Sequence, residues 1–253
     1  MGNPAGTSPS GQLVVFSTTP TTDISKLFYV KRNNGTKRKR VHHALNPSPP
    51  VHLYIGINFA VRLHHNFRFQ RHVTNINERG FIWTQFESFR HVSMMDLSAG
   101  GFKILNIPNA GGNSVDSEVL SFELLHRCFG AQLLKTEMEV AYYPEGGSIT
   151  DYTCLMFGTR LGVSVTRAMK FKGDFEPEDA EKLLRKKLNG IVNSTRNSLE
   201  DWHKQILHIW AMNHHVADQM ARAYSRMPRE FTTNTVVLVT TVTTDTDRTT
   251  IFF

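Results

Sequence analysis

Cysteine is scarce in this sequence of 253 residues, in which only Cys128 and Cys154 occur. Two cysteines cannot build the disulfide framework of a small secreted domain or a four-ligand zinc site with a Cys-x-x-Cys knuckle. The first residues also lack the apolar stretch of a secretory signal peptide. The sequence therefore predicts an intracellular protein whose two cysteines are small buried side chains.

Long hydrophobic runs are absent as well. The longest ones, such as VVLV at 236–239, are far shorter than the roughly 20 residues that a membrane-spanning helix needs. We therefore expect no membrane span and no membrane partner.

Acidic residues are nearly missing from positions 1–50, where Asp23 is the only one. Seven Lys and Arg residues stand in the same segment, so it carries +6 of the chain's net charge of +7. Gly, Pro, Ser, Thr and Asn make up 16 of the first 25 residues, which predicts a disordered basic tail over 1–50. Its cluster at 31–40 fits a nuclear import receptor, and hence a nuclear location, or a nucleic-acid backbone, through Lys37, Arg38, Lys39 and Arg40. A solvated tail with no dedicated partner explains the same charges.

Residues 51–107 alternate in the manner of β-strands. Four stretches, HLYIGINFAVRL, FRFQRHV, GFIWTQF and GFKILNI, are rich in aromatic and β-branched residues and are separated by Gly or Asn, so we expect a β-rich extension. Arg62, Arg68 and Arg71 stand among these aromatics, an arrangement that can bind single-stranded nucleic acid. Alternatively, the aromatics fill a core and the arginines lie on the solvated face.

A helix is predicted just after this segment, ending at Phe129 before Gly130. At about 100° per residue, its apolar side chains gather on one face, and Glu118 falls inside that stripe. Burying an unpaired charge costs several kcal/mol, so Glu118 needs a cation, a metal or a hydrogen-bond donor, or it stays protonated. A purely structural role for Glu118, accepting bonds from a neighbouring strand or loop, remains open.

The remainder of the chain predicts alternating strands and helices. Three strands are expected at 131–143, 148–157 and 161–170, then a helix that begins near Pro177. A doubly buried strand at 205–212, a helix at 214–227 and a second doubly buried strand at 233–242 follow. His208, inside an apolar strand, is expected to be a hydrogen-bonded core histidine. The fold class is α/β, with a mixed sheet and an αβββαβαβ core over 108–253.

This order of elements resembles the restriction-endonuclease-like core of the PD-(D/E)xK superfamily. In that superfamily the first helix often supplies a Glu, the second strand an Asp, and the third strand a carboxylate and a Lys two residues apart. The resemblance implies that Glu118 and Asp151 are the catalytic acids and the ligands of a Mg²⁺ ion. It also implies a nuclease-like function with nucleic acid as the partner.

The third strand departs from the superfamily's pattern. Alternation places Ser164, Thr166 and Lys170 on one side, so SVT stands where a carboxylate and a lysine are expected. The two hydroxyls could line a polar site beside Asp151, and only Lys170 could supply an ammonium group from this strand. Glu137 or Glu139 could add a carboxylate only if the first strand turns that face inward.

Three functions therefore stay open. The absent acid and lysine favour a nuclease-like domain that no longer cleaves and binds nucleic acid or a protein partner. An active Mg²⁺-dependent nuclease using Glu118 and Asp151 is the first alternative. A protein-interaction scaffold without a nucleic-acid role is the second.

Overall fold

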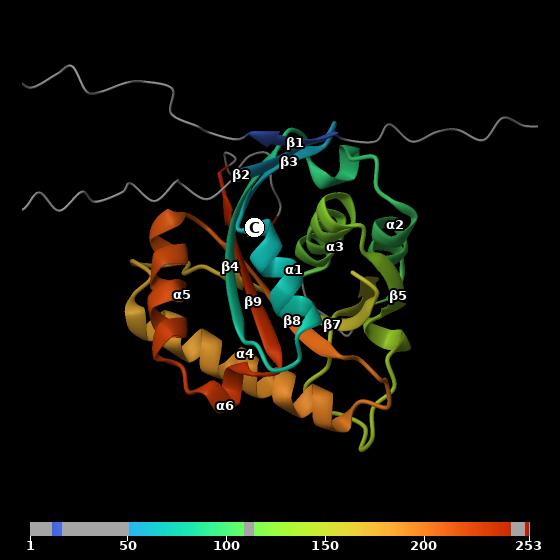
Figure 1. The fold of residues 1–253 in the computed structure, drawn as a ribbon, viewed down its shortest axis with the longest axis vertical. Helices are drawn as coiled ribbons and strands as arrows, with labels where there is room; N and C mark the ends of the chain where they lie inside the picture. The colour runs from blue at the N-terminus through green and yellow to red at the C-terminus, as the bar shows by residue number, and fades with distance from the viewer. Residues whose placement is uncertain (1–11, 17–50, 109–113, 244–250, 253) are drawn as a thin grey trace, which may run out of the picture.

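The computed structural model describes residues 12–16, 51–108, 114–243 and 251–252. These residues form an α/β protein with a nine-stranded mixed sheet in the order β1-β2-β3-β4-β9-β8-β7-β6-β5. Helices cover both faces of the sheet (Figure 1). The predicted tail residues Lys37, Arg38, Lys39 and Arg40 lie outside the described residues. Within the described ranges, no helix is long and apolar enough to cross a membrane.

Four parallel strands form the centre of the sheet: β4 (Gly80–Ser88), β9 (Thr235–Val242), β8 (Lys204–Ala211) and β7 (Thr159–Ala168). Every residue of β8 and β9 is buried. The two predicted doubly buried strands are therefore confirmed. Helices cover both faces of such a strand, so neither face is exposed to water.

Antiparallel strands extend both ends of this centre. On one side lie β3 (Phe59–His64), β2 (Val51–Ile55) and β1 (Gln12–Phe16), and on the other lie β6 (Tyr152–Met156) and β5 (Gln132–Thr136). Since β4 pairs with β9 along seven residues, the segment 51–107 and the predicted core share one sheet.

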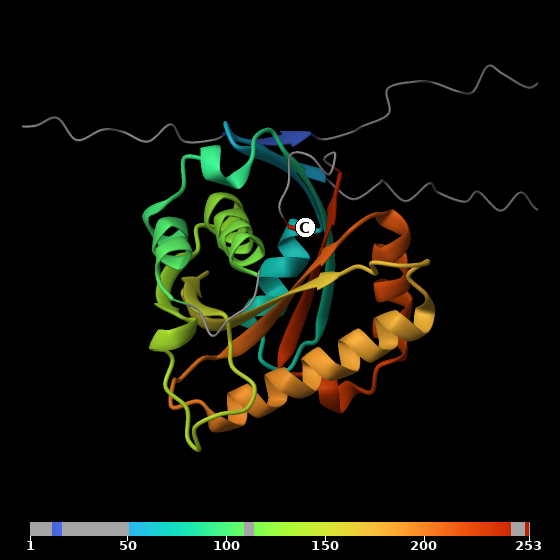
Figure 2. The same ribbon diagram turned by 180° about the vertical axis from the view of Figure 1, so that it is seen from behind.

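Two hydrophobic cores lie on opposite faces of the sheet. The first is covered by α1 (Asn66–Thr74), α2 (Ala99–Asn106) and α3 (Val115–Phe129), and the second by α4 (Pro177–Asn197), α5 (His214–Arg226) and α6 (Arg229–Thr232). The view from behind shows α4 running along the lower side of the sheet (Figure 2).

Two predicted strands are wrong. FRFQRHV belongs to α1, where Phe69 and Val73, four residues apart, are buried and Arg68 and Arg71 point outward. GFKILNI belongs largely to α2, whose cap residue Ser98 accepts a hydrogen bond from the backbone of Gly101. Short apolar runs fit both the strand and the helix period, so caps and packing decide between them.

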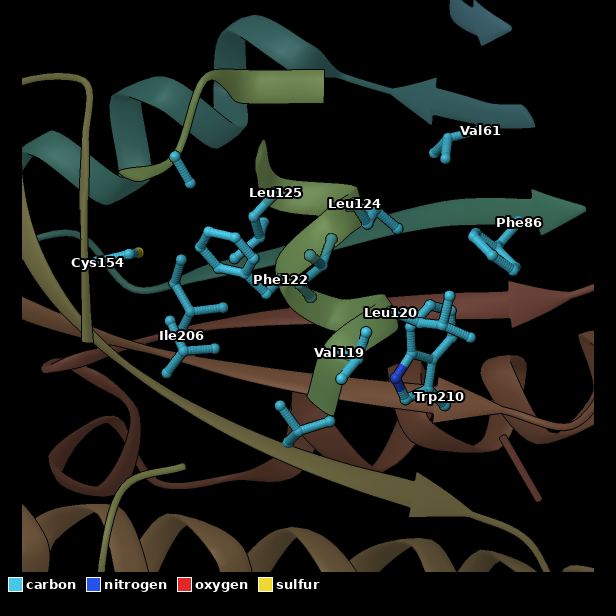
Figure 3. Packing of buried hydrophobic residues seen from close by; sticks show 14 of the residues in the cluster. Val61, Phe86, Val119, Leu120, Phe122, Leu124, Leu125, Cys154, Ile206 and Trp210 are labelled. Atoms are coloured by element: carbon cyan, nitrogen blue, oxygen red, sulfur yellow. The ribbon is translucent and has the colours of Figure 1, made fainter. Parts of the chain in front are cut away.

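The predicted helix before Gly130 is confirmed as α3, and Gly130 ends it with a φ of 70°. Figure 3 shows that its apolar side chains lie against the sheet, near Ile206 and Trp210 of β8. Trp210 also donates its indole N–H to the carbonyl of Ser117, 3.0 Å away. The buried apolar residues of α3 are Val119, Leu120, Phe122, Leu124 and Leu125.

A buried chain of polar side chains crosses the sheet beneath α3. Ser121 lies 2.8 Å from the Tyr152 hydroxyl and 2.7 Å from His208 Nδ1. His208 Nε2 lies 2.8 Å from Thr240, whose hydroxyl lies 2.7 Å from that of Thr84. Both ring nitrogens of His208 therefore have partners, which confirms the predicted core histidine, and burial lowers its pKa to about 3.

Because the folded pKa of His208 lies below its ordinary 6.5, the unfolded chain binds the extra proton first as the pH falls. The contribution of neutral His208 to stability is complete above pH 6.5 and is lost toward pH 3, at about 1.4 kcal/mol per pH unit. We expect His208→Gln to lower the free energy of unfolding by about 2 kcal/mol at pH 7 and by much less at pH 5. Urea unfolding of both proteins at the two pH values measures this, and an equal loss at both would contradict it.

Candidate active site

The candidate site lies where β6 and β7 separate. Their pairing ends at Tyr152 and Val163, while β7 continues to Ala168. Asp151, the residue before β6, accepts a hydrogen bond from the Val165 N–H through Oδ2 at 2.5 Å. The carboxylate therefore sits at the edge of β7 that β6 has left.

Glu118 approaches this edge from the first turn of α3. Its side chain is only 4% exposed, as its place in the apolar stripe predicts. Burial and the charge of Glu137 raise the pKa of Glu118, and a hydrogen bond with Ser114 and the charges of Lys187 and Arg167 partly offset the rise.

Glu137 reaches the site because the predicted strand 131–143 ends early. The strand β5 stops at Thr136, and Glu137–Glu139 forms a 3-10 turn. This turn separates the two acids that alternation in a strand would have kept on one face. Glu139 binds Lys103 at 2.7 Å and the backbone N–H of Thr136 at 2.9 Å, whereas Glu137 lines the same pocket as Asp151.

That pocket has a volume of ≈ 300 Å³ and opens between α4, the edge of β7 and the loop before β6. Lys187 is half-buried, three residues after Leu184 and four before Ile191 on the apolar stripe of α4. The lining combines carboxylates, ammonium groups and hydroxyls: Glu137, Ser148, Ile149, Asp151, Ser164, Lys186, Lys187, Gly190 and Ile191.

Electrostatics couple these groups. Burial, followed by the charge of Glu118, raises the pKa of Asp151 to about 7, and Glu137 adds to the rise. The Val165 N–H and the charge of Lys187 act in the opposite direction. An acid with a pKa near neutrality, beside two other carboxyl groups and a lysine, is typical of a functional site.

Of the other predicted site residues, one lies at the pocket and two do not. Ser164 is 7% exposed and lines the pocket, whereas Thr166 is half-buried on the same strand and is not among the lining residues. Lys170 points elsewhere: its Nζ lies 2.7 Å from Asp179 at the start of α4. The expectation that Lys170 supplies the site's ammonium is therefore wrong, because an acidic partner holds it at the far end of β7.

The predicted arginines do not form one surface. Arg62 shares a face of β3 with Ala60, opposite to the face that packs Val61 and Leu63 into the first core. Arg68 and Arg71 stand on α1, which covers that first core, and Arg71 pairs with Glu78. The sheet thus separates Arg62 from the other two.

Carboxyl groups such as those around Asp151 are the kind of ligand that a hard divalent cation prefers. In the described residues, no group of three or more His, Cys, Asp or Glu side chains is placed so that it could hold a metal ion. Mg²⁺ seldom needs such a group, since it keeps several waters and binds one or two carboxylates together with substrate phosphate. Asp151 and Glu137 line the pocket together, and the charge of Glu118 acts on Asp151, so these carboxyl groups lie near one another.

Lys187 was not found from the sequence, and Glu137 was expected only on the condition that the first strand turned that face inward. Lys187 interrupts the apolar stripe of α4 in the way Glu118 interrupts that of α3, so the same helical-phase argument could have found it. Glu137 carried no such signal, because its position depends on where β5 ends.

The fold and the pocket define an α/β protein with an acid- and lysine-lined site at the edge of its sheet. This chain is similar to the AAC-rich mRNA clone AAC4 protein of Dictyostelium discoideum, with 46% identity over 151 residues. The match covers 56% of this chain and 22% of that protein, so it spans about a fifth of the relative's length. No family model matches the chain, and no solved structure matches it.

Proposed function

We propose that this chain is a nuclease-like domain that hydrolyses a phosphodiester of DNA or RNA in the pocket between β6, β7 and α4. The observation that carries the proposal is that Asp151, Glu137 and Lys187 line one pocket, while the charge of the buried Glu118 acts on Asp151. The element order and the helix and strand acids support a restriction-endonuclease-like core.

Each side chain has a role that its position supports. Asp151 and Glu118 would hold a Mg²⁺ or Mn²⁺ ion, with Glu137 as a further oxygen donor. Such an ion, when bound, supplies charge stabilisation for the phosphoryl oxygens and acidifies water. Lys187 takes the place of the lysine missing from β7, orienting a water molecule and donating hydrogen bonds to the phosphate. Ser164 donates its hydroxyl to a phosphate oxygen.

Replacing Lys187 with glutamine tests this assignment. We expect divalent-dependent cleavage of DNA or RNA to fall by about a hundredfold or more, because the ammonium acts in the transition state. Lys182→Gln, on the same helix but exposed, is the matched control and should retain cleavage within about twofold. Cleavage is followed with labelled single- and double-stranded substrates, with and without Mg²⁺ or Mn²⁺. Equal losses in the two variants would contradict a specific role for Lys187.

A second candidate function is binding of nucleic acid without cleavage. The neutral Ser164 favours it, since this position on the third strand is where the resemblance expects a carboxylate. Measuring both binding and cleavage of the same labelled substrates separates the two functions. Salt-dependent binding without any divalent-dependent cleavage would replace the nuclease by a binding module. The absence of both would leave a protein-interaction scaffold.

A further inference from the structure

A second pocket, of ≈ 340 Å³, lies on the opposite face of the sheet from α1, at the carboxyl ends of the parallel strands. Gln85 and Glu87 come from the end of β4, Thr243 directly follows β9, and His214 begins α5, the next element after β8. Leu53, Ala60 and Arg62 of β2 and β3 complete the lining.

The topology of the sheet explains why a crevice opens here. After β4 the chain passes to α2 and α3 on the first core, and after β8 it passes to α5 on the second. The chain therefore leaves the two strands toward opposite faces, with β9 between them. In open α/β sheets, ligands bind outside the carboxyl ends of the strands at such a switch point.

One guanidinium group and two histidine rings lie in or beside this crevice. Arg62 of β3 lies opposite Gln85 of β4 in the sheet register. Within the described part of the chain, its guanidinium group has no ion-pair or hydrogen-bond partner. His64, on the same face, stacks on Trp83 with ring centroids 4.7 Å apart, and His214 meets Trp83 edge-on at 5.4 Å. Burial and the neighbouring charges of Arg62, His65 and His214 lower the pKa of His64. A phosphate group in the crevice would give the Arg62 guanidinium an anionic partner.

The rest of the lining suits the body of a small molecule. Glu87 is exposed and, like Arg62, has no ion-pair or hydrogen-bond partner among the described residues. Its carboxylate opposes a bare anion but accepts hydrogen bonds from hydroxyl or amino groups, as the Gln85 oxygen does. Leu53 and Ala60 provide an apolar floor, and the volume lies within the range of small-molecule sites.

We propose that this crevice binds the phosphate monoester of a sugar, as found in nucleoside monophosphates. Arg62 and His214 hold the phosphate, and Gln85 and Glu87 bind the hydroxyl groups of the sugar. The site is separate from the proposed nuclease pocket, because the two pockets share no lining residue and Asp151 is not part of this crevice.

Calorimetric titration of the full chain with adenosine monophosphate, inorganic phosphate and adenosine tests the proposal. Saturable binding of the monophosphate is expected, about tenfold or more tighter than that of either fragment. Arg62→Gln should weaken this binding by about tenfold or more. Arg68→Gln, an exposed arginine on the other side of the sheet, is the matched control and should change the affinity less than about twofold.

Glu87→Gln should weaken the monophosphate and leave inorganic phosphate unchanged or more tightly bound. Asp151→Asn should leave the titration unaltered, so this test of the crevice does not depend on whether the proposed nuclease pocket is correct. The proposal is overturned if the monophosphate shows no saturable binding, if Arg68→Gln causes the same loss as Arg62→Gln, or if inorganic phosphate binds as tightly as the monophosphate. A dephosphorylated oligonucleotide that competes as strongly as the monophosphate would also overturn it, by assigning the crevice to a nucleic-acid backbone.

Discussion

Asp151→Asn is expected to abolish divalent-dependent cleavage and, at pH 8, to make the folded chain more stable. The loss of cleavage should reach about a thousandfold or more, because an amide is nearly isosteric with the carboxylate but is a poor ligand for a hard cation. The gain in stability follows from the same site. The charge of Asp151 is buried and lies near Glu118 and Glu137, at a cost in free energy that asparagine does not incur.

The stability effect has a defined pH dependence. The folded pKa of Asp151 is about 7, above its ordinary 3.8, so the folded chain keeps a proton that the unfolded chain has already lost. Below pH 3.8 this group causes no penalty, and the penalty grows as the pH rises to 7 and is constant above it. We therefore expect the free energy of unfolding of the variant to exceed that of the wild type by about 1 to 3 kcal/mol at pH 8 and by almost nothing at pH 4.

Urea unfolding at pH 4, 6 and 8 measures this difference. Glu145→Gln, an exposed acid in the loop before β6, is the matched control and should change stability by less than about 0.5 kcal/mol at each pH. Mg²⁺ should stabilise the wild type at pH 8 and not the Asp151→Asn protein, since only the wild type has the acid that attracts the ion. A variant that is less stable than the wild type at pH 8 would show that the Val165 hydrogen bond outweighs the cost of burial and repulsion.

The sequence predicted those parts of the molecule whose pattern has one structural solution. Short runs that are apolar on both faces and rich in β-branched residues favour central strands, and this placed β8 and β9 correctly. An acid inside an apolar stripe must be buried, which placed Glu118. Gly130 could be assigned as a helix end because it readily adopts the left-handed conformation found there.

The failures share a physical cause. In α1 and α2, short apolar runs fit both the helix period and the strand period, and contacts distant in sequence decided between helix and strand. The sheet joins β4 to β9, so pairing between residues about 156 positions apart determines that 51–107 belongs to the same sheet. Such pairings leave no local pattern. Glu137 reached the pocket for the same reason, because the end of β5 depends on its packing against β6.

One buried cation shows how strongly such a distant contact can hold the fold together. Lys204, at the start of β8, is fully buried, yet it has no acidic partner within salt-bridge distance among the described residues. Its ammonium group donates to the carbonyls of His72 at 2.9 Å and Asn75 at 2.6 Å, and to that of Glu78. These carbonyls lie at the end of α1 and in the turn before β4, where the helix dipole favours a positive charge.

Lys204→Met is therefore expected to lower the free energy of unfolding by about 3 to 5 kcal/mol. The methionine fills a similar volume but leaves buried carbonyls without a donor, and each unsatisfied group costs about 1 kcal/mol or more. Lys182→Met makes the same chemical change at an exposed position of α4 and should cost less than about 0.5 kcal/mol. Hydrogen exchange should show the largest loss of protection in α1 and the turn to β4, because Lys204 joins that turn to the central strands. If Lys204→Met proves as mild as Lys182→Met, water must satisfy these carbonyls, and the lysine does not hold α1 to the sheet.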